Sequence, residues 1–216
     1  MIETKEHTHQ NKGYPPRKQA LQIWEQGIIY RLSRPYGFTF EDEYRFHTIG
    51  VASAAEKIAQ QIPSMDKEKA FVLGLLHDYG KRINERIEGY FHGREGYEQM
   101  MKMGYPDVAK VCLTHTFSEK DFSDKNYSYP QEWKDWARQM LKNITYDDYD
   151  RLICLCDKFF EGLSIVSISG RVKGIVNRYH LSKTAEESLF KQSMELKKYF
   201  DKKTGQDIYQ ILNIEE

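Results

Sequence analysis

The chain has 216 residues, of which 40% are hydrophobic, and its 32 basic residues balance its 32 acidic residues. This balance excludes the strongly basic surface typical of nucleic-acid-binding proteins and gives no reason to expect binding to a membrane surface. The sequence has no apolar run of about eighteen residues, so no membrane-spanning helix is expected. The polar first sixteen residues lack the apolar core of a secretory signal, and the three cysteines are typical of buried thiols. We therefore expect a cytoplasmic protein that binds neither membranes nor nucleic acid.

Residues 1–16 are predicted to form a flexible tail, and proline and glycine separate the rest of the chain into segments with helical apolar periodicity. Helices are expected at about 17–32, 39–62, 66 to the His77–Asp78 pair, 94–103, 106–117, 130 onward, 146–163 and 182–203, with a short one at the C-terminus. Their inward faces are expected to include Leu21, Trp24, Ile28, Tyr97, Met100 and Met101. No strand is expected. The predicted fold class is all-α, as a single domain over 17–216 with its core at about 40–163 and a helical extension at 164–216.

The central feature of the sequence is the apolar run at residues 70–76, which ends abruptly in His77 and Asp78 and is followed by Lys81 and Arg82. An acidic lead-in, a single β-branched residue and the length of the pattern favour a helix over a strand. A helix that is apolar on nearly every side is covered by other helices. Because a buried carboxylate is costly unless it is paired or bound to a metal, the end of this helix is predicted to be a functional site.

Three further polar side chains fall on inward helical faces, namely His47, His115 and Asp157. His47 lies four residues before Val51, and Asp157 lies four residues after Ile153, so each continues an apolar stripe. A lone histidine in such a position is more often a hydrogen-bonded core residue than a ligand. Several inward polar residues together would each need a buried partner, which favours one shared site.

Imidazole nitrogen and carboxylate oxygen, without a thiolate, suit iron, manganese, zinc, nickel or cobalt rather than a structural zinc site. The candidate ligands are His47, His77, Asp78, His92, His115 and Asp157. Adjacent helical residues point about 100° apart, so His77 and Asp78 are not expected to aim at one ion unless Asp78 bridges two. Lys81, one turn after His77, is expected on the same side, where it would contact a phosphate.

The order of these residues, H…HD…D, resembles the HD-domain metal-dependent phosphohydrolases, whose signature lies on an all-helical bundle. The segment GLLHDYGKR at residues 74–82 is similar to the central motif of that family, LLHDIGK, and the resemblance covers roughly 44–161. His92 and His115 resemble two additional histidines of the binuclear subset, which includes hydrolases of symmetrical dinucleoside tetraphosphates. The sequence departs from the motif at Tyr79, which replaces a small aliphatic residue.

The resemblance implies one or two divalent transition metals, with iron or manganese favoured, and a small phosphorylated substrate of the nucleotide type. It implies that one metal is held by His47, His77, Asp78 and Asp157, and that a second is held by His92, His115 and the bridging Asp78. The implied reaction is hydrolysis of a phosphate ester or anhydride by a water that the metal activates. Asp78 and Lys81 would be catalytic, and Lys81 with Arg82 would neutralise charge on the phosphoryl oxygens.

Three alternatives remain open at this stage. A mononuclear HD nucleotidase acting on deoxynucleoside monophosphates would bind one metal and would not need His115. A non-catalytic HD module would bind a nucleotide or a partner protein without turnover. A purely structural helical bundle would leave the buried His77, Asp78 and Asp157 without a metal.

Two other segments are candidates for shaping a pocket. The polar stretch at 118–129 is expected to be a loop, and loops of this length are often functional. The stretch at 164–179 carries Arg171, Lys173 and Arg178 and is expected to be a basic rim or, more simply, a solvated helix end.

Overall fold

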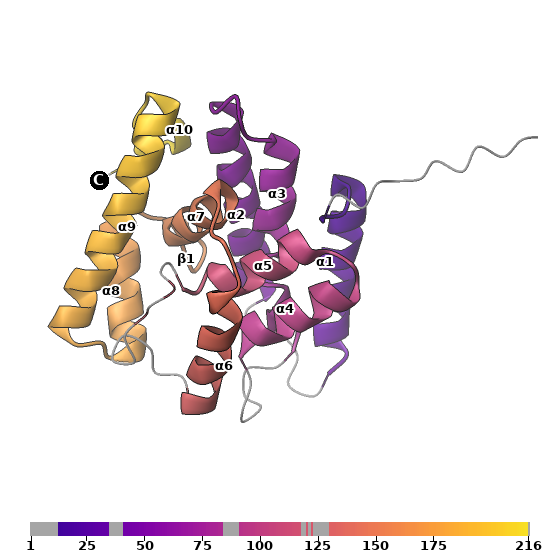
Figure 1. The fold of residues 1–216 in the computed structure, drawn as a ribbon. Coiled ribbons are helices and arrows are strands. Elements are labelled where there is room, and N and C mark those ends of the chain that lie inside the picture. Colours follow the sequence, from indigo (N-terminus) through magenta and orange to yellow (C-terminus); the bar gives the residue numbers. More distant parts are fainter. Residues whose placement is uncertain are drawn as a thin grey trace, which may run out of the picture.

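The computed structural model describes residues 13–34, 41–83, 91–117, 120, 122 and 130–215. The helices are α1 Arg17–Leu32, α2 Glu41–Gln60, α3 Lys67–Leu76, α4 His92–Lys102, α5 Pro106–Thr114, α6 Gln131–Lys142, α7 Asp148–Cys156, α8 Ile168–Tyr179, α9 Lys183–Thr204 and α10 Ile208–Leu212 (Figure 1). Two 3-10 turns, η1 Tyr79–Arg82 and η3 Asp157–Phe159, follow α3 and α7. The all-α class is confirmed.

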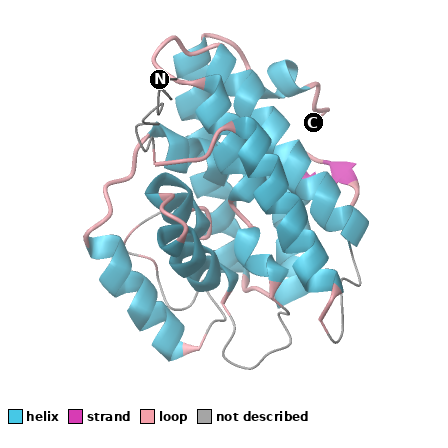
Figure 2. Ribbon diagram, turned by 90° about the vertical axis from the view of Figure 1, so that its right-hand side faces the viewer, coloured by secondary structure: helices cyan, strands magenta, loops and turns pink. Residues whose placement is uncertain are grey.

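The only strands among the described residues form a small antiparallel pair, β1 Phe160–Glu161 and β2 Ser164–Ile165 (Figure 2). The prediction of no strand was therefore wrong at this point. Gly162 has a φ of 56°, a left-handed conformation that suits a tight turn between two such strands. The pair turns the chain from the end of α7 into α8.

Helix α3 is the centre of the fold, as the apolar run predicts. All of its residues from Ala70 to Leu76 are buried, and it contacts α1, α2, α5 and α7. The side chain of Asp66 caps its start by accepting hydrogen bonds from two backbone N–H groups of the first turn. Gly74 allows α2 to approach closely, because a Cβ at that position would lie 2.8 Å from the Cα of Ala52. The approach of the two backbones fixes α2 against the end of α3.

The central helix ends at Leu76, directly before His77 and Asp78 as predicted, but Lys81 lies in the 3-10 turn η1 and not one α-helical turn after His77. Gly80 explains this break. A Cβ at Gly80 would lie 1.9 Å from the carbonyl oxygen of His92, so only glycine allows η1 to pack against α4. His77 and Asp78 consequently lie at a helix end, and not within a continuous helix.

Other helix ends also differ from the predictions. α5 ends at Thr114 and α7 at Cys156, so His115 and Asp157 follow these helices directly, whereas His92 is the first residue of α4. The early ends of α5 and α7 turn both side chains towards the end of α3.

Two residues that were expected inside lie outside. Leu21 is 38% exposed and Met101 is 46% exposed, because α1 and α4 bury narrower stripes through Trp24, Ile28 and Met100. The three cysteines are buried and unpaired, as predicted. Residues 1–12, Thr39 and most of the 118–129 stretch lie outside the described residues.

The C-terminal helices α8 and α9 lie side by side and flank α7 at the edge of the molecule (Figure 1). Ser167 and Ser182 cap their N-termini, as predicted for Ser182, and Gly205 in the left-handed conformation ends α9. Phe200 of α9 is fully buried and joins the same apolar core as α2, α3 and α7. In the described part of the chain, no helix has both the length and the apolar composition needed to cross a bilayer.

Candidate metal centre

The six predicted ligands come from five separate places in the fold and meet at one point. His47 comes from α2, His77 and Asp78 follow α3, His92 begins α4, His115 follows α5, and Asp157 follows α7. Each lies at or near a helix end that the packing around α3 brings to the same side of the core. The helical periodicity of the sequence indicated that His47, His115 and Asp157 point inward. The helix ends at His115 and Asp157 then turn these side chains towards the other ligands.

The first group of ligand atoms surrounds one carboxylate oxygen. The Nε2 atoms of His47 and His77 lie 3.2 Å apart, and each is 3.4 Å from Oδ2 of Asp78. Oδ1 of Asp157 lies 3.1 Å from Nε2 of His47 and 3.7 Å from Nε2 of His77. These spacings are typical of donors that surround a single cation.

The second group surrounds the other oxygen of the same carboxylate. Oδ1 of Asp78 lies 3.4 Å from Nε2 of His115 and 3.6 Å from Nε2 of His92, and these two nitrogens are 3.3 Å apart. Asp78 therefore faces both groups, one with each oxygen. The difficulty of aiming His77 and Asp78 at one ion is thereby removed.

Two of the imidazoles are oriented by backbone carbonyls. Nδ1 of His77 lies 2.7 Å from the carbonyl oxygen of Gly74, and Nδ1 of His115 lies 3.0 Å from that of Val111. Each Nδ1–H donates to its carbonyl, so the neutral form of each ring carries its lone pair on Nε2, which faces the centre. This is the tautomer that a metal-binding histidine needs.

A buried atom without a donor supports the fit of a metal ion. Asp78 is 1% exposed, and within the described ranges its Oδ1 has no hydrogen-bond partner. A buried carboxylate oxygen without a donor is unfavourable, whereas a cation between this oxygen and the two neighbouring imidazoles would satisfy it. The donor set and the orphaned oxygen both fit divalent transition metals.

The electrostatics of the centre also favour bound positive charge. Burial alone would lower the pKa of His77, but the carboxylates of Asp78 and Asp157 outweigh it and raise that pKa to about 9. Burial lowers the pKa of His92 to about 3 and also lowers the pKa of His115, so both imidazoles are neutral at neutral pH. Neutral imidazoles beside ionised carboxylates form a site that attracts cations.

The carboxylates stay ionised because cationic side chains lie against them. Burial would raise the pKa of Asp78, but Lys81 and His77 hold it well below its usual range. Nζ of Lys81 lies 2.6 Å from Oδ2 of Asp78, and Nζ of Lys158 lies 2.8 Å from Oδ2 of Asp157. Lys81 is therefore beside the centre as predicted, although it contacts Asp78 from a 3-10 turn.

Two cationic residues at the centre were not predicted as site residues. Lys158 directly follows Asp157, and a guanidinium nitrogen of Arg171 lies 3.8 Å from Oδ1 of Asp157. Arg171 belongs to the stretch that was expected to be either a basic rim of a pocket or a solvated helix end; its side chain is only 12% exposed, lines the cavity and also pairs with Glu161. A solvated helix end is thus the wrong description of that residue. No sequence signal linked α8 to Asp157.

Arg82 lies elsewhere. Its guanidinium is 2.5 Å from a carboxylate oxygen of Glu95 and packs over the ring of Tyr79. It does not line the cavity that opens beside the metal centre. The geometry therefore gives no support to the predicted contact between Arg82 and a phosphate.

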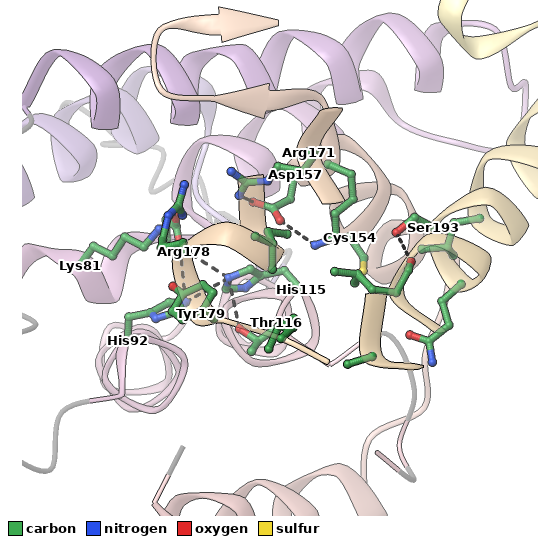
Figure 3. Close-up of a pocket in the computed structure, with 18 residues that line it drawn as sticks. Lys81, His92, His115, Thr116, Cys154, Asp157, Arg171, Arg178, Tyr179 and Ser193 are labelled. Atoms are coloured by element: carbon green, nitrogen blue, oxygen red, sulfur yellow. Dashed lines mark hydrogen bonds and ion pairs between the residues drawn. The ribbon is translucent and has the colours of Figure 1, made fainter. Parts of the chain in front are cut away.

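The cavity beside the centre has a volume of about 210 Å³, and its lining includes Asp78, His92, His115 and Asp157. Lys81 and Lys158 also line it, together with Arg171 and Arg178 of α8. In Figure 3, Lys81 and His92 lie at one end of this cavity and Ser193 of α9 lies at the other. The candidate ligands are therefore accessible to a small molecule.

A comparison with known families agrees with this geometry. The HD domain family matches residues 44–161, which is more than half of the chain. The chain therefore belongs to the HD domain family, whose members are generally metal-dependent phosphohydrolases. No significant match was found among curated proteins or among solved structures.

Proposed function

We propose that this protein is a binuclear metal-dependent phosphohydrolase that cleaves a phosphate ester or anhydride of a nucleotide-type substrate. The observation that carries the proposal is the position of Asp78 between two groups of histidines. One carboxylate oxygen faces His47 and His77, and the other faces His92 and His115. A carboxylate in this position suits a bridge between two cations.

The residues would divide between two metal ions. His47, His77 and Asp157 would hold the first ion, His92 and His115 would hold the second, and Asp78 would contact both. The bound ions would activate a water for attack and polarise the phosphoryl group. The mixture of imidazole and carboxylate donors without a thiolate suits iron, manganese, zinc, nickel or cobalt, and the family resemblance favours iron or manganese among them.

The surrounding cations would hold the phosphoryl group in position. Lys81 and Lys158 each contact one of the ligand carboxylates and line the cavity, so both would present an ammonium group to a phosphoryl group bound at the centre. Positive charge at this place stabilises the negative charge that builds on the phosphoryl oxygens in the transition state. We assign Lys81 this role together with the catalytic carboxylate Asp78.

The first test is the metal content of protein purified without chelator or histidine tag, measured by elemental analysis beside an assay of phosphate release. We expect about two first-row metals per chain. We also expect release of phosphate from a panel of dinucleoside polyphosphates, cyclic dinucleotides and nucleoside monophosphates. The experiment is repeated after supplementation with iron or manganese.

The other outcomes separate the alternatives. About one metal, with activity confined to monophosphates, would support a mononuclear nucleotidase in which His92 and His115 do not bind metal. Binding of nucleotide without turnover by the metal-loaded protein would indicate a non-catalytic module. Absence of metal after supplementation would overturn the proposal.

A further inference from the structure

The cavity beside the metal centre is built largely by helices that lie outside the region matched by the HD domain family. Ten of the eighteen lining residues fall between residues 171 and 196, beyond the end of the family match at residue 161. They come from α8, from α9 and from the turn between them. The C-terminal extension therefore forms most of the space in which a substrate would lie.

The lining residues of α9 form one helical stripe. They are Ala185, Leu189, Gln192, Ser193 and Leu196, with separations of four, three, one and three residues, which place them on one side of the helix. The hydroxyl of Ser193 donates to the carbonyl oxygen of Leu189 at 2.8 Å, so its hydrogen is already used within the helix. The stripe consequently offers a mainly apolar surface.

The lining residues of α8 and of the turn after it include a charged residue near the metal centre and apolar residues further along the chain. Arg171 lies against Asp157 at the metal end, and Ile175, one turn further on, faces the same cavity as Leu189. Leu181, in the turn that follows α8, continues the apolar surface. The cavity thus has a charged end, formed by the metal centre and its cations, and an apolar wall formed by Ile175, Leu181, Ala185, Leu189 and Leu196.

We propose that this apolar wall binds the organic part of the substrate while the metal centre holds its phosphate. The inference rests on the proposed function and specifies the substrate class: a small phosphorylated compound with an apolar, ring-sized group next to the phosphate. In a nucleotide, the base would reach this wall across the sugar that joins it to the phosphate. The cavity of about 210 Å³ is smaller than the pockets of about 300–1,000 Å³ that enclose drug-sized ligands, which suits a compact group.

The test uses phosphonates, which the protein cannot hydrolyse at the carbon–phosphorus bond by the proposed reaction. Binding of methylphosphonate, phenylphosphonate and 1-naphthylmethylphosphonate to the metal-loaded protein is measured by isothermal titration calorimetry. All three carry the same anionic head, so the metal centre and the cations contribute equally. We expect the affinity to rise by about tenfold or more from the methyl to the aromatic compounds, since the aromatic group buries apolar surface.

A matched pair of variants locates the effect on the wall. Leu189→Ser places a hydroxyl on the cavity side of α9, whereas Phe190→Ser makes a similar change at the next residue, which is 41% exposed and does not line the cavity. We expect Leu189→Ser to remove most of the preference for the aromatic phosphonates, and Phe190→Ser to keep it. Circular dichroism and thermal unfolding confirm that both variants are folded.

The outcomes separate this inference from the proposed function. Equal affinity of the unmodified protein for all three phosphonates would overturn the apolar-wall proposal, even if phosphate esters are hydrolysed. An equal loss of preference in Leu189→Ser and Phe190→Ser would also overturn it, because the binding surface would then lie elsewhere. The protein could also prefer the aromatic phosphonates through Leu189 but hydrolyse no substrate. This result would support the apolar-wall proposal and contradict the proposed hydrolase function.

Discussion

The region matched by the HD domain family and the pair of helices that follows it contribute in different ways to one cavity. The matched region supplies all six candidate ligands, and among them His77, Asp78, His115 and Asp157 are buried. Helices α8 and α9 supply none of these ligands but most of the remaining lining. Their lining side chains are mostly half-buried, as a binding surface requires, whereas four of the six ligands are buried.

This difference indicates that reaction chemistry and substrate preference are carried by separate parts of the sequence. The ligands depend on the close packing of α2, α3, α5 and α7, in which each backbone position is constrained by its neighbours. The apolar wall depends on a helical stripe whose side chains can be exchanged without altering that packing. Substitutions in the two regions should therefore have different consequences, and the predictions below test this contrast.

The largest effect is expected from Asp78→Ala, because Asp78 is shared by both groups of ligands. We expect loss of both metals and a fall in kcat/KM of at least about a thousandfold. Elemental analysis and phosphate release measure the two effects on the same preparation.

Two further variants control this experiment. Asp78→Asn keeps the shape of the side chain but removes its charge, and it should lose metal in the same way. Asp135→Ala changes a carboxylate on α6 whose side chain is 62% exposed, and it should keep both metal and activity. An Asp78→Ala protein that is folded and retains both metals and activity would show that the centre has been wrongly assigned.

A smaller effect is expected when a ligand from only one group is removed. His115→Ala should lower the metal content from about two to about one and reduce kcat by about a hundredfold. His47→Ala, which removes a ligand of the other group, should also leave about one metal. The comparison is measured by elemental analysis of both variants in parallel.

The mononuclear alternative predicts a different pattern for the same pair. In that case His47→Ala would lose the only metal, and His115→Ala would retain it together with its activity. That pattern would contradict the role of Asp78 as a bridge between two metals. It would still agree with metal binding by the first group of ligands.

The inward positions of the ligands were easier to predict from the sequence than the local structure around these ligands. Helical periodicity placed His47, His115 and Asp157 on the buried faces of their helices, because apolar stripes reflect burial directly. The 3-10 turn after α3 was not predicted, because it depends on contact between Gly80 and the backbone of His92, which lies on another element. A local pattern carries no information about such a contact.

The same limit explains why the contact between Arg171 and Asp157 was not predicted. Its own segment contains arginines, a lysine and glycines, which is typical of a solvated helix end. Its burial follows from the turn through β1 and β2, which brings α8 back over Asp157 and Glu161. The basic composition was visible in the sequence, but the carboxylates that it faces became apparent only from the tertiary structure.

The smallest effect is expected from Arg178→Gln, at the boundary between the two regions. Three cations, Arg171, Arg178 and Lys158, face two carboxylates, Glu161 and Asp157, so one positive charge remains in excess. Arg178 lines the cavity, but its side chain is 49% exposed, so solvent and salt screen its charge. We expect KM for a phosphorylated substrate to rise by about threefold, with kcat and metal content unchanged.

The excess charge also predicts a dependence on salt, because attraction of an anion by an exposed cation weakens as ionic strength increases. The difference in KM between the unmodified protein and Arg178→Gln should therefore shrink between low and high salt. Lys173→Gln is the matched control, since Lys173 is an exposed cation of the same helix that does not line the cavity. Equal KM values for Arg178→Gln and the unmodified protein at low salt would show that Arg178 only holds Glu161 in place, so that α8 acts on the substrate through Arg171 and its apolar side chains.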